Sequence, residues 1–153
     1  MTLMTLDALK AELPPGRRLL GIDPGSKTVG VALSDPLRLV ANPRENLKRG
    51  KFTDLAARLE ALMIAEEVAG IIVGLPLNMD GSVGPSAQSA KQFAENLAAR
   101  LNTPVALWDE RLSTAAVERT LIEADLSRRR RAEVVDKLAA TYILQGALDY
   151  LAR

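Results

Sequence analysis

Residues 17–35 read RRLLGIDPGSKTVGVALSD, and this stretch decides the fold. Its two apolar runs, residues 17–23 and 29–34, are predicted to be the strands of a hairpin, because the turn-forming residues 24–27 separate them. Asp23 stands where the first strand ends. A carboxylate is costly to bury in such an apolar run unless a cation compensates its charge. The hairpin therefore makes Asp23 a candidate functional residue.

The composition restricts which cation that carboxylate can hold. The chain has 153 residues and contains neither His nor Cys, so a metal ion would be bound by oxygen atoms alone. Oxygen ligands favour Mg²⁺ or Mn²⁺ over zinc, copper or haem iron. The N-terminal residues lack the pattern of a signal peptide, and no apolar stretch approaches the length of a membrane span. We therefore expect a cytoplasmic protein.

Charge and aromatic content bear on the binding of nucleic acid. The net charge is +1 and aromatic residues make up 3% of the chain. This charge is not that of a protein coated in nucleic acid, but it permits a local basic patch. The few aromatic residues leave little material for base-stacking platforms.

The order of elements predicts the fold class. After the hairpin, apolar periodicity predicts a third strand within residues 39–47, a helix over 53–68 stopped by Gly70, a buried strand at 71–73, a helix from Pro85, a strand at 105–108, a helix over 113–123, a basic linker at 125–131 and a last helix over 132–151. Alternating helices and strands imply parallel strands joined by crossover helices. The prediction is an α/β, ribonuclease H-like mixed five-stranded sheet, three antiparallel strands then two parallel, flanked by helices on both faces.

The N-terminal residues are predicted to form a separate short extension. Four leucines, Leu3, Leu6, Leu9 and Leu13, are spaced as on one side of an amphipathic helix, which the prolines at 14 and 15 would end. We therefore divide the chain into an extension over residues 1–15 and a ribonuclease H-like domain over residues 16–153.

Three acidic residues are predicted to meet in this fold. Asp23 and Glu110 end two parallel strands, whose carboxyl ends share one edge of the sheet, where open sheets bind their ligands. Asp136 lies in the apolar stripe of the last helix, where a lone carboxylate needs a cation. Three oxygen donors suit one or two divalent cations, which can activate water and stabilise the entering and leaving oxygens of a phosphodiester.

Each acid alone has a simpler explanation. Asp23 can belong to a plain hairpin turn, Glu110 to a solvated strand end, and Asp136 to an ion pair with a nearby Arg or Lys. Taken together with the element order, the three favour a metal site. Asp109 is predicted to point away from Glu110, because side chains alternate along a strand.

Basic residues near these acids are candidates for binding phosphate groups. They are Lys27, Arg111 and the run Arg128, Arg129, Arg130 and Arg131, which precedes the helix that carries Asp136. A solvated linker explains the run equally well. The basic residues of segments 17–18 and 48–51 are weaker candidates. The polar loop 77–84 fits a substrate-contacting loop and a plain surface connection equally well.

At four segments the chain resembles the YqgF family, also called RuvX. They are GIDPG at 21–25 with VGVA at 29–32, VGLPLNMDG at 73–81, DERLST at 109–114 and VDKLAA at 135–140. The resemblance covers about residues 17–150 and implies a ribonuclease H-like fold related to the RuvC Holliday junction resolvases. It implies that the catalytic acids are Asp23, Glu110 and Asp136. The implied activity is metal-dependent hydrolysis of phosphodiester bonds in maturing the 5′ end of 16S ribosomal RNA.

One position departs from the resolvase relatives, which usually carry a fourth acid one turn from the last Asp. The residue three after Asp136 is Ala139. This difference weakens a transfer of junction-resolving activity and leaves the number of metal ions open.

We therefore expect a nuclease that acts on RNA, namely pre-16S ribosomal RNA, rather than on structured DNA. One alternative is a Holliday junction resolvase-like DNA nuclease, and a homodimer would suit such a two-stranded substrate. A second is a catalytically silent nucleic-acid-binding assembly factor, although all three acids are present. A sugar-kinase or actin-like phosphotransferase would need two such domains, which 153 residues do not provide.

Overall fold

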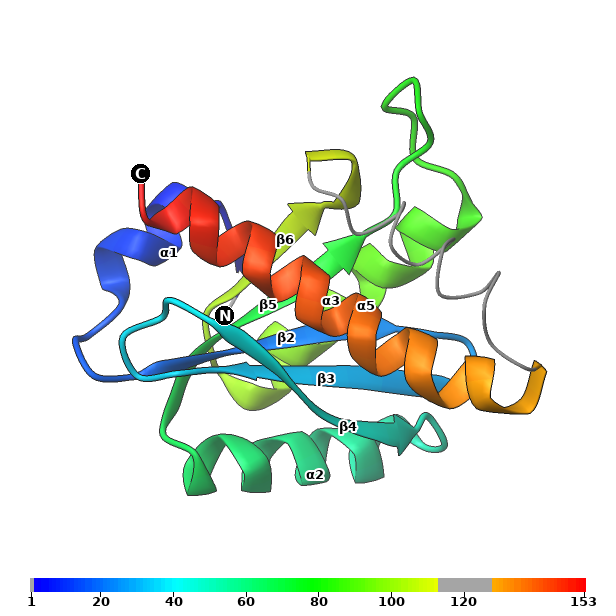
Figure 1. Ribbon diagram of the computed structural model, residues 1–153, viewed down its shortest axis with the longest axis horizontal. Coiled ribbons are helices and arrows are strands. Elements are labelled where there is room, and N and C mark those ends of the chain that lie inside the picture. The colour runs from blue at the N-terminus through cyan, green and yellow to red at the C-terminus, as the bar shows by residue number, and fades with distance from the viewer. Residues whose placement is uncertain (1, 113–127) are drawn as a thin grey trace.

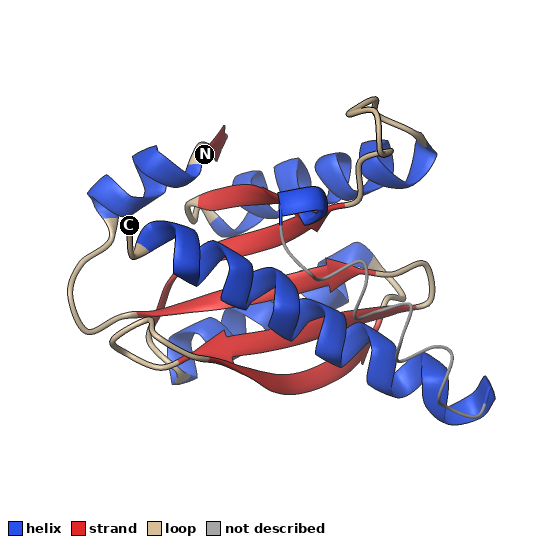
Figure 2. Ribbon diagram, turned by 45° about the horizontal axis from the view of Figure 1, so that its top comes forward, coloured by secondary structure: helices blue, strands red, loops and turns tan. Residues whose placement is uncertain are grey.

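The computed structural model describes residues 2–112 and 128–153, with side chains over 2–112 and 138–153. A six-stranded sheet in the order β1-β6-β5-β2-β3-β4 lies between helices α1 and α5 on one face and α2 and α3 on the other (Figures 1 and 2). The strands are β1 Leu3–Met4, β2 Arg18–Pro24, β3 Thr28–Ser34, β4 Ala41–Lys48, β5 Val68–Leu75 and β6 Val105–Asp109. The helices are α1 Leu6–Glu12, α2 Phe52–Ala65, α3 Pro85–Leu101, the 3₁₀ turn η1 Glu110–Leu112 and α5 Arg128–Leu151.

The pairing of the strands confirms the ribonuclease H-like α/β architecture. Strands β2, β3 and β4 form an antiparallel meander. Strand β5 pairs parallel with β2, and β6 pairs parallel with β5. The predicted number of strands was wrong, because β1 adds a sixth strand parallel to β6. Its two residues, Leu3 and Met4, are too few to show any alternation in the sequence.

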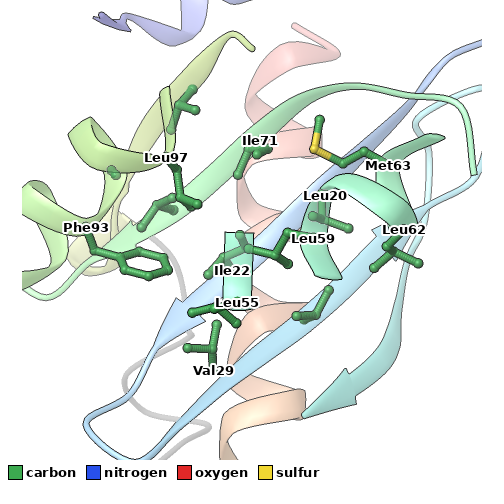
Figure 3. Packing of buried hydrophobic residues seen from close by; sticks show 14 of the residues in the cluster. Leu20, Ile22, Val29, Leu55, Leu59, Leu62, Met63, Ile71, Phe93 and Leu97 are labelled. Atoms are coloured by element: carbon green, nitrogen blue, oxygen red, sulfur yellow. The ribbon is translucent and has the colours of Figure 1, made fainter. Parts of the chain in front are cut away.

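Each face of the sheet has its own hydrophobic core. On the α2 and α3 face, Leu20 and Ile22 of β2 pack with Leu59 of α2 and Leu97 of α3 (Figure 3). On the other face, Leu19 of β2 belongs to a cluster with residues of α5. The alternation of neighbouring β2 residues between the two clusters shows that this strand is buried on both sides, as its unbroken apolar sequence requires.

The N-terminal helix α1 packs on the same face as α5. The side chain of Thr5 caps it by accepting a hydrogen bond from the Ala8 N–H at 3.1 Å. Leu9 is fully buried in the α5-side cluster. The N–H of Leu13 closes the last turn on the Leu9 carbonyl at 3.1 Å, and Pro14 follows. The amphipathic helix predicted from the four leucines is thus shorter than predicted and covers Leu6–Glu12, because Leu3 lies in strand β1 and Leu13 is the C-cap.

Strand β5 is longer than predicted, because Gly70 lies inside it and does not end helix α2. The chain instead leaves α2 through Glu66 and Glu67, and Glu67 has a φ of 53°. A side chain at position 70 would meet Leu19 and Leu9, each 3.1 Å from the added Cβ. Gly70 therefore allows close packing of these leucines rather than a helix stop.

Helix α5 begins earlier than predicted. Residues 128–131, assigned to a linker, are its first turn, and the whole helix, Arg128–Leu151, has 24 residues. The predicted helix over 113–123 lies outside the described residues. Neither α5 nor any other helix in the described part of the chain is both long and apolar enough to cross a membrane.

Candidate active site

Two acidic side chains are buried at the carboxyl edge of the parallel strands. Asp23 is the last residue but one of β2, and Glu110 follows directly after β6. Each of these two residues is only 5% exposed, although each lies at the end of a strand. Strand β5 lies between them and runs parallel to both, so the three carboxyl ends share one edge (Figure 1).

The Glu110 carboxylate lies beside Gly74 of the middle strand β5. A Cβ added to Gly74 would lie 3.5 Å from Oε2 of Glu110, so this oxygen reaches from the end of β6 to the middle strand. The same added Cβ would clash with Cδ1 of Ile143 from α5. The missing side chain thus lets α5 approach the sheet at this point, on the strand that adjoins β2.

Helix α5 crosses the sheet over β2, close to the first acid. A Cβ added to Gly21 would lie 2.6 Å from Cβ of Leu144 and 3.0 Å from the carbonyl oxygen of Ala140. Asp136 lies in α5 one helical turn before Ala140, and its side chain is outside the described residues. Among the side chains that are described, no three acidic groups form a metal-binding cluster.

The chemistry of the donor set fits a hard divalent cation. Asp23 and Glu110 are the two charged side chains among the buried polar residues of the described chain. Burying carboxylates raises their free energy unless an opposite charge compensates them. Carboxylate oxygens are the ligands that Mg²⁺ and Mn²⁺ prefer.

Arg111 forms an ion pair with Asp109 beside this edge. Its Nη2 and Nε atoms donate to the Asp109 carboxylate at 2.8 and 3.1 Å, and its backbone N–H donates at 3.0 Å. These hydrogen bonds lower the pKa of Asp109 and raise the pKa of the Arg111 guanidinium. The carboxylate of Asp109 is therefore committed to Arg111, while that of Glu110 is buried over Gly74.

The loop between β5 and α3, residues 76–84, contacts this ion pair. Nη1 of Arg111 donates to the carbonyl of Met79 at 3.4 Å. The loop is tied together by hydrogen bonds between Asn78 and Ser82, backbone to backbone at 3.0 Å and side chain to side chain at 3.0 Å. Met79 itself is 89% exposed at the tip. Arg111 thus links the end of β6 to the loop that follows β5.

Two further groups of basic residues lie in the elements around the site. Lys27 is an exposed residue of the turn between β2 and β3, directly after the strand that carries Asp23. Arg128, Arg129, Arg130 and Arg131 begin α5, and their side chains are outside the described residues.

Arg49 was only a weak candidate in the sequence, yet it lies against the Asp23 turn. Its Nη1 donates to the carbonyl of Gly25 at 2.7 Å, and its backbone N–H donates to the carbonyl of Lys27 at 3.0 Å. No local sequence pattern predicts this contact, because it depends on the antiparallel register of β3 and β4. For Gly74 a local signal exists, since a glycine inside an apolar strand often marks a close approach.

A mixed sheet with an antiparallel meander, parallel additions and buried acids at the carboxyl edge defines a protein of the ribonuclease H-like class. Comparison with known proteins narrows this assignment. The sequence pattern of the RuvX family, described as Holliday junction resolvase, matches residues 17–150. The chain belongs to the RuvX family.

Relatives agree with this family assignment, and a solved structure agrees with the fold. A protein of Cereibacter sphaeroides named "Putative pre-16S rRNA nuclease" is 54% identical over 147 residues, 96% of this chain and 92% of its own. A protein of the same name from Paramagnetospirillum magneticum is 54% identical over 97% of this chain and 96% of its own. Thermus thermophilus RuvC in complex with a Holliday junction substrate superposes with a TM-score of 0.51 at 14% identity, covering 88% of this chain and 95% of that one. That likeness concerns the fold alone.

Proposed function

We propose that this chain is a divalent-metal-dependent nuclease that hydrolyses phosphodiester bonds, with pre-16S ribosomal RNA as its substrate in the cytoplasm. Relatives more than 50% identical over nearly the whole chain carry the name of a pre-16S rRNA nuclease, which supports the substrate. The buried carboxylates at the carboxyl edge of the sheet support the metal.

One observation carries the proposal more than any other. The Glu110 carboxylate is buried and reaches the middle strand over Gly74, one strand away from the strand that ends in Asp23. Two carboxylates buried at one edge of the sheet offer the hard oxygen ligands that Mg²⁺ and Mn²⁺ prefer, which supports a cation shared between the two acids.

The proposed ligands are Asp23, Glu110 and Asp136. Asp136 joins the set because α5 touches β2 at Gly21, two residues before Asp23, and Asp136 lies one turn from that contact. When bound, a divalent cation supplies activation of the attacking water and charge neutralisation at the leaving oxygen. The chain contains no His that would serve as a base, which suits this chemistry.

Basic side chains would hold the substrate beside these acids. The proposed phosphate-binding residues are Lys27, Arg111 and the run Arg128, Arg129, Arg130 and Arg131. A polyanion is repelled by three carboxylates, so cations on the surrounding elements are needed to keep its backbone in place. The N-terminus of a helix carries partial positive charge, so four arginines at the start of α5 do not stabilise the helix. This favours a role for them in binding.

A resolvase-like DNA nuclease is the second candidate, since the family carries the description Holliday junction resolvase. Ala139 bears on it, because this residue is fully buried in α5. An acid at this position would be buried in the core, so the alanine weakens the case for the resolvase-like nuclease. A homodimer would suit a two-stranded substrate and is therefore part of this second proposal.

The proposal is tested by cleavage of a precursor RNA with an extended 5′ end of 16S rRNA, in Mg²⁺ and in Mn²⁺. Asp23→Asn should lower the cleavage rate at least about hundredfold, because it removes a carboxylate from the metal site. Asp35→Asn is the matched control, since it makes the same chemical change in the turn between β3 and β4, at the other end of β3 from the Asp23 turn, and should retain the native rate.

Three outcomes separate the alternatives. Equal cleavage by the native protein and Asp23→Asn would contradict the assigned site. Faster cleavage of a four-way DNA junction than of the RNA would favour the resolvase-like nuclease. RNA binding without cleavage by the native protein would favour a silent assembly factor.

A further inference from the structure

Two adjoining hollows extend from the Asp23 turn along helix α3. The first, of about 450 Å³, is lined by Asp23, Gly25, Ser26 and Ser86 among others. The second, of about 540 Å³, is lined by Phe52, Gln88, Gln92 and Asn96 among others. Arg49, Pro85 and Ser89 line both, so the two hollows form one continuous surface, which we call the α3 groove.

The α3 groove combines apolar side chains with uncharged polar ones and is nearly free of acidic groups. The side of α3 that faces it carries Gln88, Ser89, Gln92 and Asn96, which are all exposed and all uncharged. Apart from Asp23 at its start, the described residues that line the groove include no Asp or Glu. Hydrogen-bonding groups without negative charge suit an anionic chain, which carboxylates would repel.

Arg49 supplies a positioned cation where the two hollows meet. It donates to the Gly25 carbonyl at 2.7 Å, and its guanidinium lies 5.0 Å from the centre of the Phe93 ring. Because these contacts hold the side chain in place, little conformational entropy is lost when it binds a phosphate. Three exposed lysines add positive charge near it: Lys27 between β2 and β3, Lys48 at the end of β4, and Lys51 just before α2.

We propose that the α3 groove binds the sugar-phosphate backbone of the nucleic-acid strand that continues beyond the cleaved bond. The inference rests on the proposed function, which supplies the nucleic acid, and adds where its flanking strand lies. The groove is on the α2 and α3 side of the sheet, whereas α5 with its arginines is on the other side (Figures 1 and 2). The α3 groove is thus a second contact surface, separate from that of α5.

The test measures binding rather than cleavage, so that it does not depend on the active site. Full-length protein carrying Asp23→Asn, which is expected to leave the substrate intact, is titrated into a fluorescently labelled single-stranded RNA of mixed sequence. In this background Gln88→Glu and Gln92→Glu are introduced together, which adds two negative charges to exposed groove positions. We expect the dissociation constant to rise about tenfold or more at low salt.

The matched control changes the same helix by the same charge. Lys91→Glu also lowers the net charge by two, and Lys91 is exposed on α3 but does not line the groove. It should alter the dissociation constant by less than about twofold. Thermal unfolding of each variant checks that the fold is kept, and surface substitutions of this kind should leave it intact.

The possible outcomes distinguish a failure of the groove proposal from a failure of the proposed nuclease function. Equal weakening by the groove pair and by Lys91→Glu would overturn the groove, because it would show a general charge effect. Unchanged binding by the groove pair would also overturn it, as would a parent protein that binds no RNA. Selective weakening by the groove pair would support the groove even if the native protein cleaves nothing, in which case only the proposed function fails.

Discussion

Individual glycines set how closely α5 approaches the sheet. Gly21 and Gly74 lie on neighbouring strands, and a Cβ on either would enter the space held by Leu144 or Ile143. The approach brings the helix down onto the strand ends where the two buried acids lie. Small residues at these two positions are therefore required by the packing of α5 on the sheet.

Gly74→Ala should lower the free energy of unfolding by about 1–3 kcal/mol, because the new methyl group collides with Cδ1 of Ile143. Ile143→Val removes that atom and alone should cost about 0.5–1.5 kcal/mol. The double variant should lose less than the sum of the two by at least about 0.5 kcal/mol. Urea unfolding of all four proteins measures this coupling, and strictly additive losses would contradict the assigned contact.

Sequence reasoning finds Asp23 and Glu110 because a carboxylate at the end of an apolar strand stands out in the local pattern. It does not find that Glu110 lies over Gly74. That contact depends on strand order and on Ile143, which is far away in the chain, so no local pattern carries it. The structure buries both acidic side chains, but their role as metal ligands stays a prediction, as does the whole placement of the Asp136 side chain, which is outside the described residues.

At the scale of elements, the turn between β3 and β4 is held by one carboxylate. Asp35 accepts hydrogen bonds from the backbone N–H groups of Leu39 and Val40 at 2.7 and 2.9 Å. The bond from Val40 is the main reason why the pKa of Asp35 lies below its usual value of 3.8. The charged carboxylate thus adds two hydrogen bonds to those that the turn forms internally, from the Asp35 N–H to the Val40 carbonyl at 3.2 Å and from the Arg38 N–H to the Asp35 carbonyl at 3.0 Å.

This shift predicts a pH dependence of stability. Because the pKa is lower in the folded state, the ionised carboxylate stabilises the fold above the unfolded value, and this contribution is lost as the pH falls through the folded pKa. The Asp35→Asn variant has no ionisable side chain at this position. The difference in unfolding free energy between native protein and variant should therefore be constant near neutral pH and shrink below a pH of about 4. Urea unfolding over that pH range measures it, and a constant difference throughout would contradict the assignment.

Elements with strong periodicity were predicted well, and those with mixed signals were not. Helix α3 begins at Pro85 as predicted, since a proline fits the first turn of a helix. Gly70 was misread as a helix stop, because a glycine after an apolar helix and a glycine in a packed strand look alike in one sequence. The start of α5 was placed too late, because a run of arginines indicates a solvated linker as readily as a helical turn.

At the scale of the whole molecule, the two ends of the chain pack together. The Tyr150 hydroxyl of α5 donates to the Asp7 carboxylate at 3.2 Å, and Lys10 donates to the Arg153 carbonyl at 2.7 Å. Leu9 fills the core between α1 and the sheet beside Gly70. These contacts suggest that the first residues unfold together with the rest.

Leu9→Ala should lower the free energy of unfolding by about 2–5 kcal/mol, since it leaves a cavity in the α5-side core. Leu37→Ala is the matched control, because Leu37 is 74% exposed and the same truncation there should cost less than about 0.5 kcal/mol. Circular dichroism and the fluorescence of Trp108, the single tryptophan, should report one shared transition. Separate transitions would mean that residues 1–15 form an independent extension.

The placement of helices on opposite faces has a consequence for the shape of the substrate. A nucleic-acid strand bound at both proposed surfaces, the first turn of α5 and the α3 groove, would pass from one face of the sheet to the other. Duplex DNA has a persistence length of about 50 nm and resists a tight curve. If both surfaces bind one strand, a polymer with a flexible joint between them, such as an unpaired end, should bind more tightly than a continuous double helix, and the preference would come from stiffness rather than from base sequence.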